Sequence, residues 1–176
     1  VYLESKATFV KYDDETRFLG MFLTDENGHE IFVRAYDSET RRLINMEAQR
    51  LAEGDPNPIF PAVGDIVTVR GNLRVRPEFQ MMILQFAEGL SVERPAATPI
   101  TIENLVENAP VSSEYQRFEI SGKVLNIENE GWSVILTVYE IESETEISVL
   151  LPKVMFMFGR TLNAKIGDEV VVRGAY

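Results

Sequence analysis

The chain carries one nine-residue pattern twice, and this repeat decides how the rest of the sequence is interpreted. From Val63 to Gly71 the chain reads VGDIVTVRG, and from Ile166 to Gly174 it reads IGDEVVVRG. Seven of the nine positions are identical or conservative apolar matches. In both copies a Gly-Asp pair typical of a turn precedes alternating apolar residues, which predict a β-strand. Because the two copies lie far apart, they indicate a repeated domain rather than a short solenoid unit.

Around the first copy, period-two alternation predicts five strands and one helix. The expected strands cover residues 7–12, 18–24, 31–36, 66–76 and 79–86. Asn27-Gly28 predicts a tight turn between the second and third strands, because this pair readily adopts positive φ angles. After the third strand the apolar period changes to that of a helix beginning at Asp37 or Ser38. Its expected buried face comprises Leu43, Ile44, Ala48 and Leu51.

The same order begins again after residue 94. Residues 94–99 contain two prolines and predict a linker, and Thr101 is expected to cap a short helix over 102–108. Strands are expected at 118–127, 132–139, 146–151 and 169–173, with a helical or irregular connector at 152–165. No fifth strand follows, so we expect the second copy to be incomplete at its C-terminal end.

The order β-β-β-α-β-β is the layout of the OB-fold, a five-stranded Greek-key barrel. We therefore expect an all-β fold class with short helices, built from two OB barrels in tandem. The predicted division is a first barrel over 1–94, a linker with a short helix over 95–112, and a second barrel over 113–176.

The repeated Gly-Asp strand and the hairpin Leu23-Thr24-Asp25-x-x-Gly28 resemble OB-fold domains of the replication protein A or single-stranded-DNA-binding type. The resemblance implies non-catalytic binding of a single strand, DNA rather than RNA, across the second and third strands. OB barrels also bind proteins and serve as scaffolds, so fold alone does not decide between these functions. An assembly scaffold that does not bind nucleic acid is the alternative.

Composition excludes several classes of site. The chain has no cysteine and a single histidine, His29, which rules out disulfides, cysteine-ligated zinc and most histidine-based catalysis. It contains no P-loop, GxGxxG or HExxH motif. We therefore expect no enzyme activity, no cofactor and no metal. No apolar run approaches the roughly 20 residues of a membrane helix, so we expect an intracellular protein without a membrane partner, cytoplasmic or, in a eukaryote, nuclear.

Charge opposes indiscriminate binding to nucleic acid. The net charge is −11, which repels a polyanion at long range. Residues 1–95 carry 11 Lys and Arg against 16 Asp and Glu, and residues 96–176 carry 6 against 12. Any nucleic-acid site must therefore be a local group of basic residues on an acidic protein.

Alternation across the second and third strands defines a candidate site. The expected interior residues are Leu19, Met21, Leu23, Ile31, Val33 and Ala35. The opposite, outward face then carries Phe18, Phe22, Phe32, Arg34 and Tyr36. Aromatic rings stack on bases, and arginine contacts phosphates or stacks by cation–π attraction. The alternative is structural, with these aromatics covered by another part of the chain.

The fourth strand continues this candidate site. Its expected interior residues are Val67, Val69, Leu73 and Val75, and its outward residues include Arg70, Arg74 and Arg76. Three arginines at alternate positions form a basic stripe leading into the following turn. The alternative is a solvated edge whose arginines pair with glutamates.

The second barrel is expected to lack such a candidate nucleic-acid site. Its third strand places Ile147, Val149 and Leu151 inward and Glu146, Ser148 and Leu150 outward, so no aromatic or cation occupies the corresponding face. The bulky apolar segment Val154–Phe158 suits a core or a partner site. We expect this barrel to be structural or to contact a protein partner.

Overall fold

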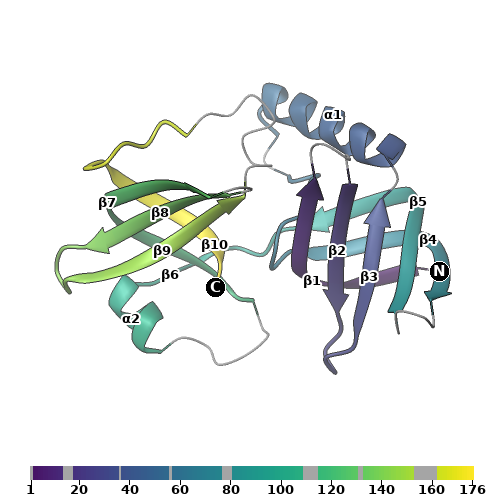
Figure 1. The fold of residues 1–176 in the computed structure, drawn as a ribbon, viewed down its shortest axis with the longest axis horizontal. Helices are drawn as coiled ribbons and strands as arrows, with labels where there is room; N and C mark the ends of the chain where they lie inside the picture. Colours follow the sequence, from purple (N-terminus) through teal and green to yellow (C-terminus); the bar gives the residue numbers. More distant parts are fainter. Residues whose placement is uncertain are drawn as a thin grey trace. The chain divides into compact units, whose positions relative to one another are not determined.

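A computed structural model describes residues 2–13, 18–35, 37–55, 57–76, 81–108, 115–130, 133–152 and 162–176. Within these ranges it does not describe the side chains of Asp13, Phe18, Arg76, Pro152 and residues 81–89. The chain divides into two compact units, Val1–Pro95 and Ala96–Tyr176. Both units consist mainly of β-strands, as Figure 1 shows.

The first unit is an OB-fold barrel. Its elements are β1 (Tyr2–Asp13), β2 (Phe18–Thr24), β3 (Glu30–Ala35), α1 (Asp37–Glu53), β4 (Ile66–Arg76) and β5 (Met81–Glu93). The strands form a closed barrel in the order β1-β2-β3-β5-β4, in which β5 runs parallel to β3 and every other pair is antiparallel. Helix α1 connects β3 to β4 and lies across one end of the barrel (Figure 1). The predicted fold class is confirmed.

Alternation along β2, β3 and β4 builds the core of this unit. Its buried residues include Leu19, Met21, Leu23, Val33, Ala35, Val67 and Val69, each at most 2% exposed. Fully burying a side chain of this size stabilises the fold by roughly 1.5–3 kcal/mol. These residues match the predicted interior set.

The prediction for the far half of β4 is wrong. Leu73 and Val75 were expected inside, but 42% and 63% of their surface is exposed. Strand β1 pairs with β4 only between Ile66 and Arg70. Beyond Arg70, β5 is the one described strand that pairs with β4, so in the described part of this unit the far half of β4 stays accessible.

The buried face of α1 also differs from the predicted one. The helix begins at Asp37 as expected, but Ala48 is exposed. The buried residues are Thr40, Leu43, Glu47 and Arg50. Leu43 is therefore buried as predicted, while the rest of the face holds charged side chains, which a helix can bury when they are paired.

The charged pair on α1 attaches the helix to the loop that precedes β4. Arg50 donates hydrogen bonds to Glu47, which also accepts from the backbone N–H groups of Ile59 (3.0 Å) and Phe60 (3.2 Å). Burial alone would raise the pKa of Glu47, but the Arg50 and backbone donors outweigh it and lower this pKa below its ordinary value.

The Gly-Asp turn joins β4 to β1. Gly64 has φ of +86°, which favours glycine, and its N–H donates to the Ala7 carbonyl (2.8 Å). The Ala7 N–H donates in return to the Asp65 carbonyl (2.8 Å). The buried Asp65 carboxylate accepts from the Ala62 N–H (2.7 Å) and from two nitrogens of Arg94 (2.8 and 2.9 Å). The turn thus holds together β1, β4 and the end of β5.

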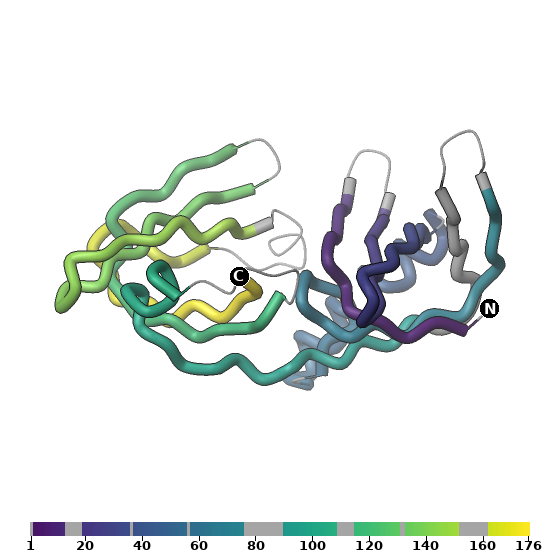
Figure 2. The backbone as a smooth tube through the Cα atoms, turned by 90° about the horizontal axis from the view of Figure 1, so that it is seen from below, coloured from purple at the N-terminus to yellow at the C-terminus, as the bar shows by residue number. Residues whose placement is uncertain are grey.

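The described residues of the second unit repeat four of the five strands. Its elements are β6 (Thr98–Pro99), α2 (Ile102–Glu107), β7 (Arg117–Glu130), β8 (Ser133–Glu140), β9 (Thr145–Pro152) and β10 (Glu169–Ala175). The sheet order β10-β7-β8-β9 reproduces β4-β1-β2-β3, and β6 adds to β7 in parallel. Figure 2 shows the path of the backbone, coloured along the sequence. Trp132 and Val154–Phe158 lie outside the described residues.

The second Gly-Asp turn has the same geometry as the first. Gly167 has φ of +95°, its N–H donates to the Val124 carbonyl (2.8 Å), and the Val124 N–H donates to the Asp168 carbonyl (2.9 Å). Val124 therefore corresponds to Ala7, and both are fully buried. The repeated sequence pattern thus forms the same hydrogen-bonded turn in both units.

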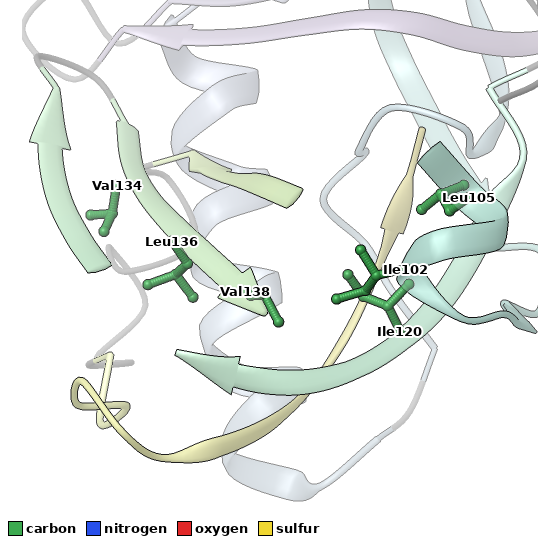
Figure 3. Close-up of a cluster of buried hydrophobic side chains, with 6 residues drawn as sticks. All are labelled: Ile102, Leu105, Ile120, Val134, Leu136 and Val138. Atoms are coloured by element: carbon green, nitrogen blue, oxygen red, sulfur yellow. The ribbon is translucent and has the colours of Figure 1, made fainter. Parts of the chain in front are cut away.

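Helix α2 belongs to the second unit rather than to a linker. Ile102 and Leu105 pack in the same core as Ile120, Val134, Leu136 and Val138 (Figure 3). The cap is as predicted, with the Thr101 hydroxyl accepting from the Asn104 N–H (3.2 Å). In the segment expected as a linker over 95–112, the described residues 98–107 therefore belong to the second unit. In the described parts of both units, no helix is long and apolar enough to cross a membrane.

We predict that Arg94→Ala lowers the free energy of unfolding of the first unit by about 2–3 kcal/mol, because it leaves the Asp65 carboxylate buried without its cation. Hydrogen exchange at the Ala7 and Gly64 amides measures this loss. The control is Arg173→Ala, which breaks an exposed ion pair with Glu119 in the second unit and should cost less than about 1 kcal/mol. Equal losses in the two variants would contradict the assigned role of Arg94.

Candidate nucleic-acid interface

Three phenylalanines form one row across the outside of the first barrel. Phe9 of β1 is paired with Phe22 of β2, and Phe22 is paired with Phe32 of β3. Ring centroids lie 5.9 Å apart for Phe9 and Phe22 and 5.2 Å apart for Phe22 and Phe32. The rings are tilted by 54° and 52°, a favourable arrangement for aromatic neighbours. We call Phe9, Phe22 and Phe32 the aromatic row.

The aromatic row faces away from the core. Met21 and Val33, which neighbour Phe22 and Phe32 along their strands, are fully buried. Phe9 is 46% exposed, and Phe22 and Phe32 are half-buried. The rings thus offer a solvent-accessible apolar surface supported by their own mutual contact.

A second row, next to the aromatic one, carries two cations. Lys11 is paired with Gly20, and Gly20 is paired with Arg34. Lys11 is exposed and Arg34 is half-buried. Gly20 itself is buried, so the two cations stand on either side of a covered stretch of backbone.

Arg74 of β4 lies in line with the aromatic row, two strands beyond Phe32. Phe32 is paired with Ile83 of β5, and Ile83 is paired with Arg74 of β4. Two strand spacings separate Arg74 from Phe32, roughly 10 Å. Arg74 is exposed, and its long side chain can reach a phosphate of a strand stacked on the rings.

Arg70 is not part of this arrangement. It is exposed but paired with Tyr2 of β1, seven positions before Phe9. At about 3.3 Å per residue, this places it roughly 20 Å from Phe9. Of the other predicted residues, Tyr36 and the side chains of Phe18 and Arg76 lie outside the described part of the structure.

The sequence patterns did not identify Phe9 and Lys11. Strict alternation puts Phe9 on the same side as Ala7, which is buried. A β-bulge between Ala7 and Phe9 inserts one residue and turns Phe9 outward. A signal was present in the second copy, where apolar Val124 and polar Asn126 stand two residues apart and a bulge occurs at the same place.

The second unit provides an internal comparison for this face. Its row equivalent to Phe9, Phe22 and Phe32 consists of Asn126, Thr137 and Ser148. The row equivalent to Lys11, Gly20 and Arg34 consists of Glu128, Ile135 and Leu150. Neither row contains an aromatic or a cation. Glu146, Ser148 and Leu150 are exposed as predicted, whereas Ile147, Val149 and Leu151 pack against the core.

The hairpin between β2 and β3 is held by a hydrogen-bonded turn. The carboxylate of Asp25 accepts from the backbone N–H groups of Asn27 (2.9 Å) and His29 (2.8 Å), and its second oxygen lies 3.0 Å from the His29 ring. The His29 side chain, followed by these backbone donors, lowers the pKa of Asp25 from 3.8 to about 2. A lowered folded-state pKa means that Asp25 supports the turn above pH 4 and loses this effect as the pH falls through about 2.

Comparisons with known proteins do not decide the function. No protein-family model and no curated protein matches the chain. Similar solved structures include the tetrameric p202 HIN2 (9% identity, 96% of this chain and 78% of that chain, TM-score 0.29) and the Ifi202 HINa domain in complex with 20 bp dsDNA (11%, 96% and 81%, 0.31). A murine DNA-binding protein bound with double-stranded DNA is a third (15%, 96% and 80%, 0.24).

At these TM-scores the similarity carries no weight for fold or function, and the fold assignment rests on the strand order. None of the three is described as a replication protein A, so that resemblance stays a prediction. In the part of the chain that the structure describes, no cluster of three or more His, Asp or Glu residues could hold a metal ion.

Proposed function

We propose that the first unit binds single-stranded nucleic acid on the outer face of β1, β2 and β3, without catalysis. Bases stack on the aromatic row, and Lys11, Arg34 and Arg74 contact the phosphates. The observation that carries this proposal is the contact of three outward phenylalanines from three adjacent strands, flanked by cations. DNA is favoured over RNA only through the resemblance to replication protein A.

A single strand suits this face better than a duplex. Stacking requires the flat face of an unpaired base, and it contributes about 1–3 kcal/mol per base without depending on sequence. In a duplex the bases already stack on one another, and the protein meets mainly phosphates. The aromatic row would then be unused.

Net charge limits where the binding energy can come from. A chain with a charge of −11 gains nothing from long-range attraction to a polyanion. Binding must therefore depend on stacking and on a few short-range phosphate contacts. This predicts moderate affinity, low sequence preference and a shallow salt dependence.

We predict that Phe9→Ala weakens binding of labelled oligo-dT by roughly 5- to 150-fold, the equivalent of about 1–3 kcal/mol for one lost stacking contact. Phe9 is suited to this test because it is 46% exposed, so that its truncation removes less buried surface than that of a core residue. Fluorescence anisotropy with oligo-dT and oligo-U measures the affinity for DNA and for RNA.

The matched control is Asn126→Ala at the equivalent position of the second unit. It should leave the affinity unchanged. The proposal is wrong if Phe9→Ala and Asn126→Ala bind alike, or if the unaltered protein shows no binding at tens of micromolar concentration.

A salt titration tests the phosphate contacts separately. Three cations on three phosphates predict a slope of log K against log salt concentration near −2, from about −0.7 per phosphate for a single strand. Lys11→Ala should make the slope shallower by about 0.7. Glu128→Ala, at the equivalent position of the second unit, should not change it. A slope that is the same in both variants would exclude Lys11 from the site.

A further inference from the structure

The outer face of β2 and β3 carries opposite charges on the two sides of the aromatic row. On one side, two residues along each strand, Gly20 is paired with Arg34. On the other side, again two residues along, Thr24 is paired with Glu30. Residues two apart in a strand point to the same face, so Arg34 and Glu30 flank Phe32 on one surface. Each lies roughly 7 Å from Phe32 along the strand, at about 3.3 Å per residue.

Hydrogen bonds hold the acidic side of this face beside the rings. The Thr24 hydroxyl donates to the Glu30 carboxylate (3.4 Å), and the hydroxyl oxygens of Thr24 and Thr8 lie 2.8 Å apart. With its own proton on Glu30, Thr24 accepts from Thr8. Thr8 is buried, whereas Glu30 is exposed. Since a carboxylate has about four lone-pair sites, Glu30 keeps acceptor capacity for a ligand on the rings.

This distribution of charge sets the direction in which a nucleotide lies across the aromatic row. The proposed function places phosphates beside Lys11 and Arg34, and a phosphate beside Glu30 would be repelled. A nucleotide stacked on the rings therefore extends from the cations toward Thr24 and Glu30. Its hydrogen-bonding edge, which lies opposite the sugar and the phosphate, then meets the carboxylate.

We propose that Glu30 selects bases that carry an exocyclic amino group, so that the first unit binds cytosine in preference to thymine. This inference rests on the proposed function and names the bases that the same site takes. The N4 amino group of cytosine donates to a carboxylate, whereas thymine has the acceptor O4 at that position. The two pyrimidines have rings of the same size, and stacking is tolerant of sequence. The preference for cytosine is therefore modest and adds to binding by the aromatic row.

Lys6 does not change this preference. It is paired with Thr24 from β1, on the side away from Glu30, and is half-buried. An ammonium group at this position can donate to a carbonyl oxygen of the base. Cytosine and thymine both carry the carbonyl oxygen O2, so Lys6 cannot distinguish between them.

The second unit supplies a matched carboxylate. Its row equivalent to Lys6, Thr24 and Glu30 consists of Lys123, Tyr139 and Glu146. Glu146 is exposed like Glu30, but the neighbouring row holds Asn126, Thr137 and Ser148 in place of the three phenylalanines. A substitution of Glu146 therefore removes the same charge from the chain without touching the proposed site.

The test compares oligo-dC with oligo-dT of equal length by fluorescence anisotropy in neutral buffer. The unaltered chain should bind oligo-dC about fivefold more tightly, as expected for one exposed hydrogen bond to a carboxylate. Glu30→Gln should abolish this preference, because an amide can donate to O4 as well as accept from N4. Glu146→Gln should keep the preference. Phe9→Ala should weaken binding of both oligonucleotides and leave their ratio unchanged.

Failure of this inference differs from failure of the proposed function. Equal affinity of the unaltered chain for the two oligonucleotides, with both weakened by Phe9→Ala, would refute selection by Glu30 and leave stacking on the aromatic row intact. So would a fivefold preference that persists in Glu30→Gln, because Glu30 would then act only by repelling phosphates. Absence of binding to either oligonucleotide would refute both proposals.

Discussion

The reciprocal hydrogen bonds between Ala7 and the Gly64-Asp65 turn are the interaction on which the first barrel depends. They join the middle of β1 to the start of β4, and the Asp65 carboxylate fixes the end of β5 through Arg94. The turn requires glycine because Gly64 has a positive φ angle. The same pair of hydrogen bonds recurs at Val124 in the second unit, so the same type of turn joins two strands in each sheet.

The function proposed for the first unit follows from what happens next to this turn. Ala7 is the last residue before the β-bulge, and the bulge reverses which residues of β1 face out. Phe9 therefore joins Phe22 and Phe32 in one row. The second unit has the same turn and the same bulge but places Asn126 at this position. The scaffold is thus shared, and the side chains on its outer face distinguish the two units.

Sequence patterns predicted the strand order and most of the face, because alternation is regular along β2 and β3. Phe22, Phe32 and Arg34 were identified in this way. Phe9 was missed because a bulge depends on pairing between strands that are distant in sequence. Leu73 was placed inside because its exposure depends on how far β1 extends alongside β4. The buried face of α1 was predicted only in part, because beside Leu43 it holds the ion pair of Glu47 with Arg50.

If the proposed function is right, nucleic acid binds to the aromatic row of the first unit and not to the equivalent face of the second. Amide chemical shifts of the ¹⁵N-labelled chain, recorded during titration with oligo-dT, distinguish the two faces. The largest shifts are expected at Gly20, Phe22 and Phe32, with Thr137 and Ser148 unchanged. Shifts concentrated in the second unit, or absent from the outer face of the first barrel at saturating oligonucleotide, would exclude binding to the aromatic row.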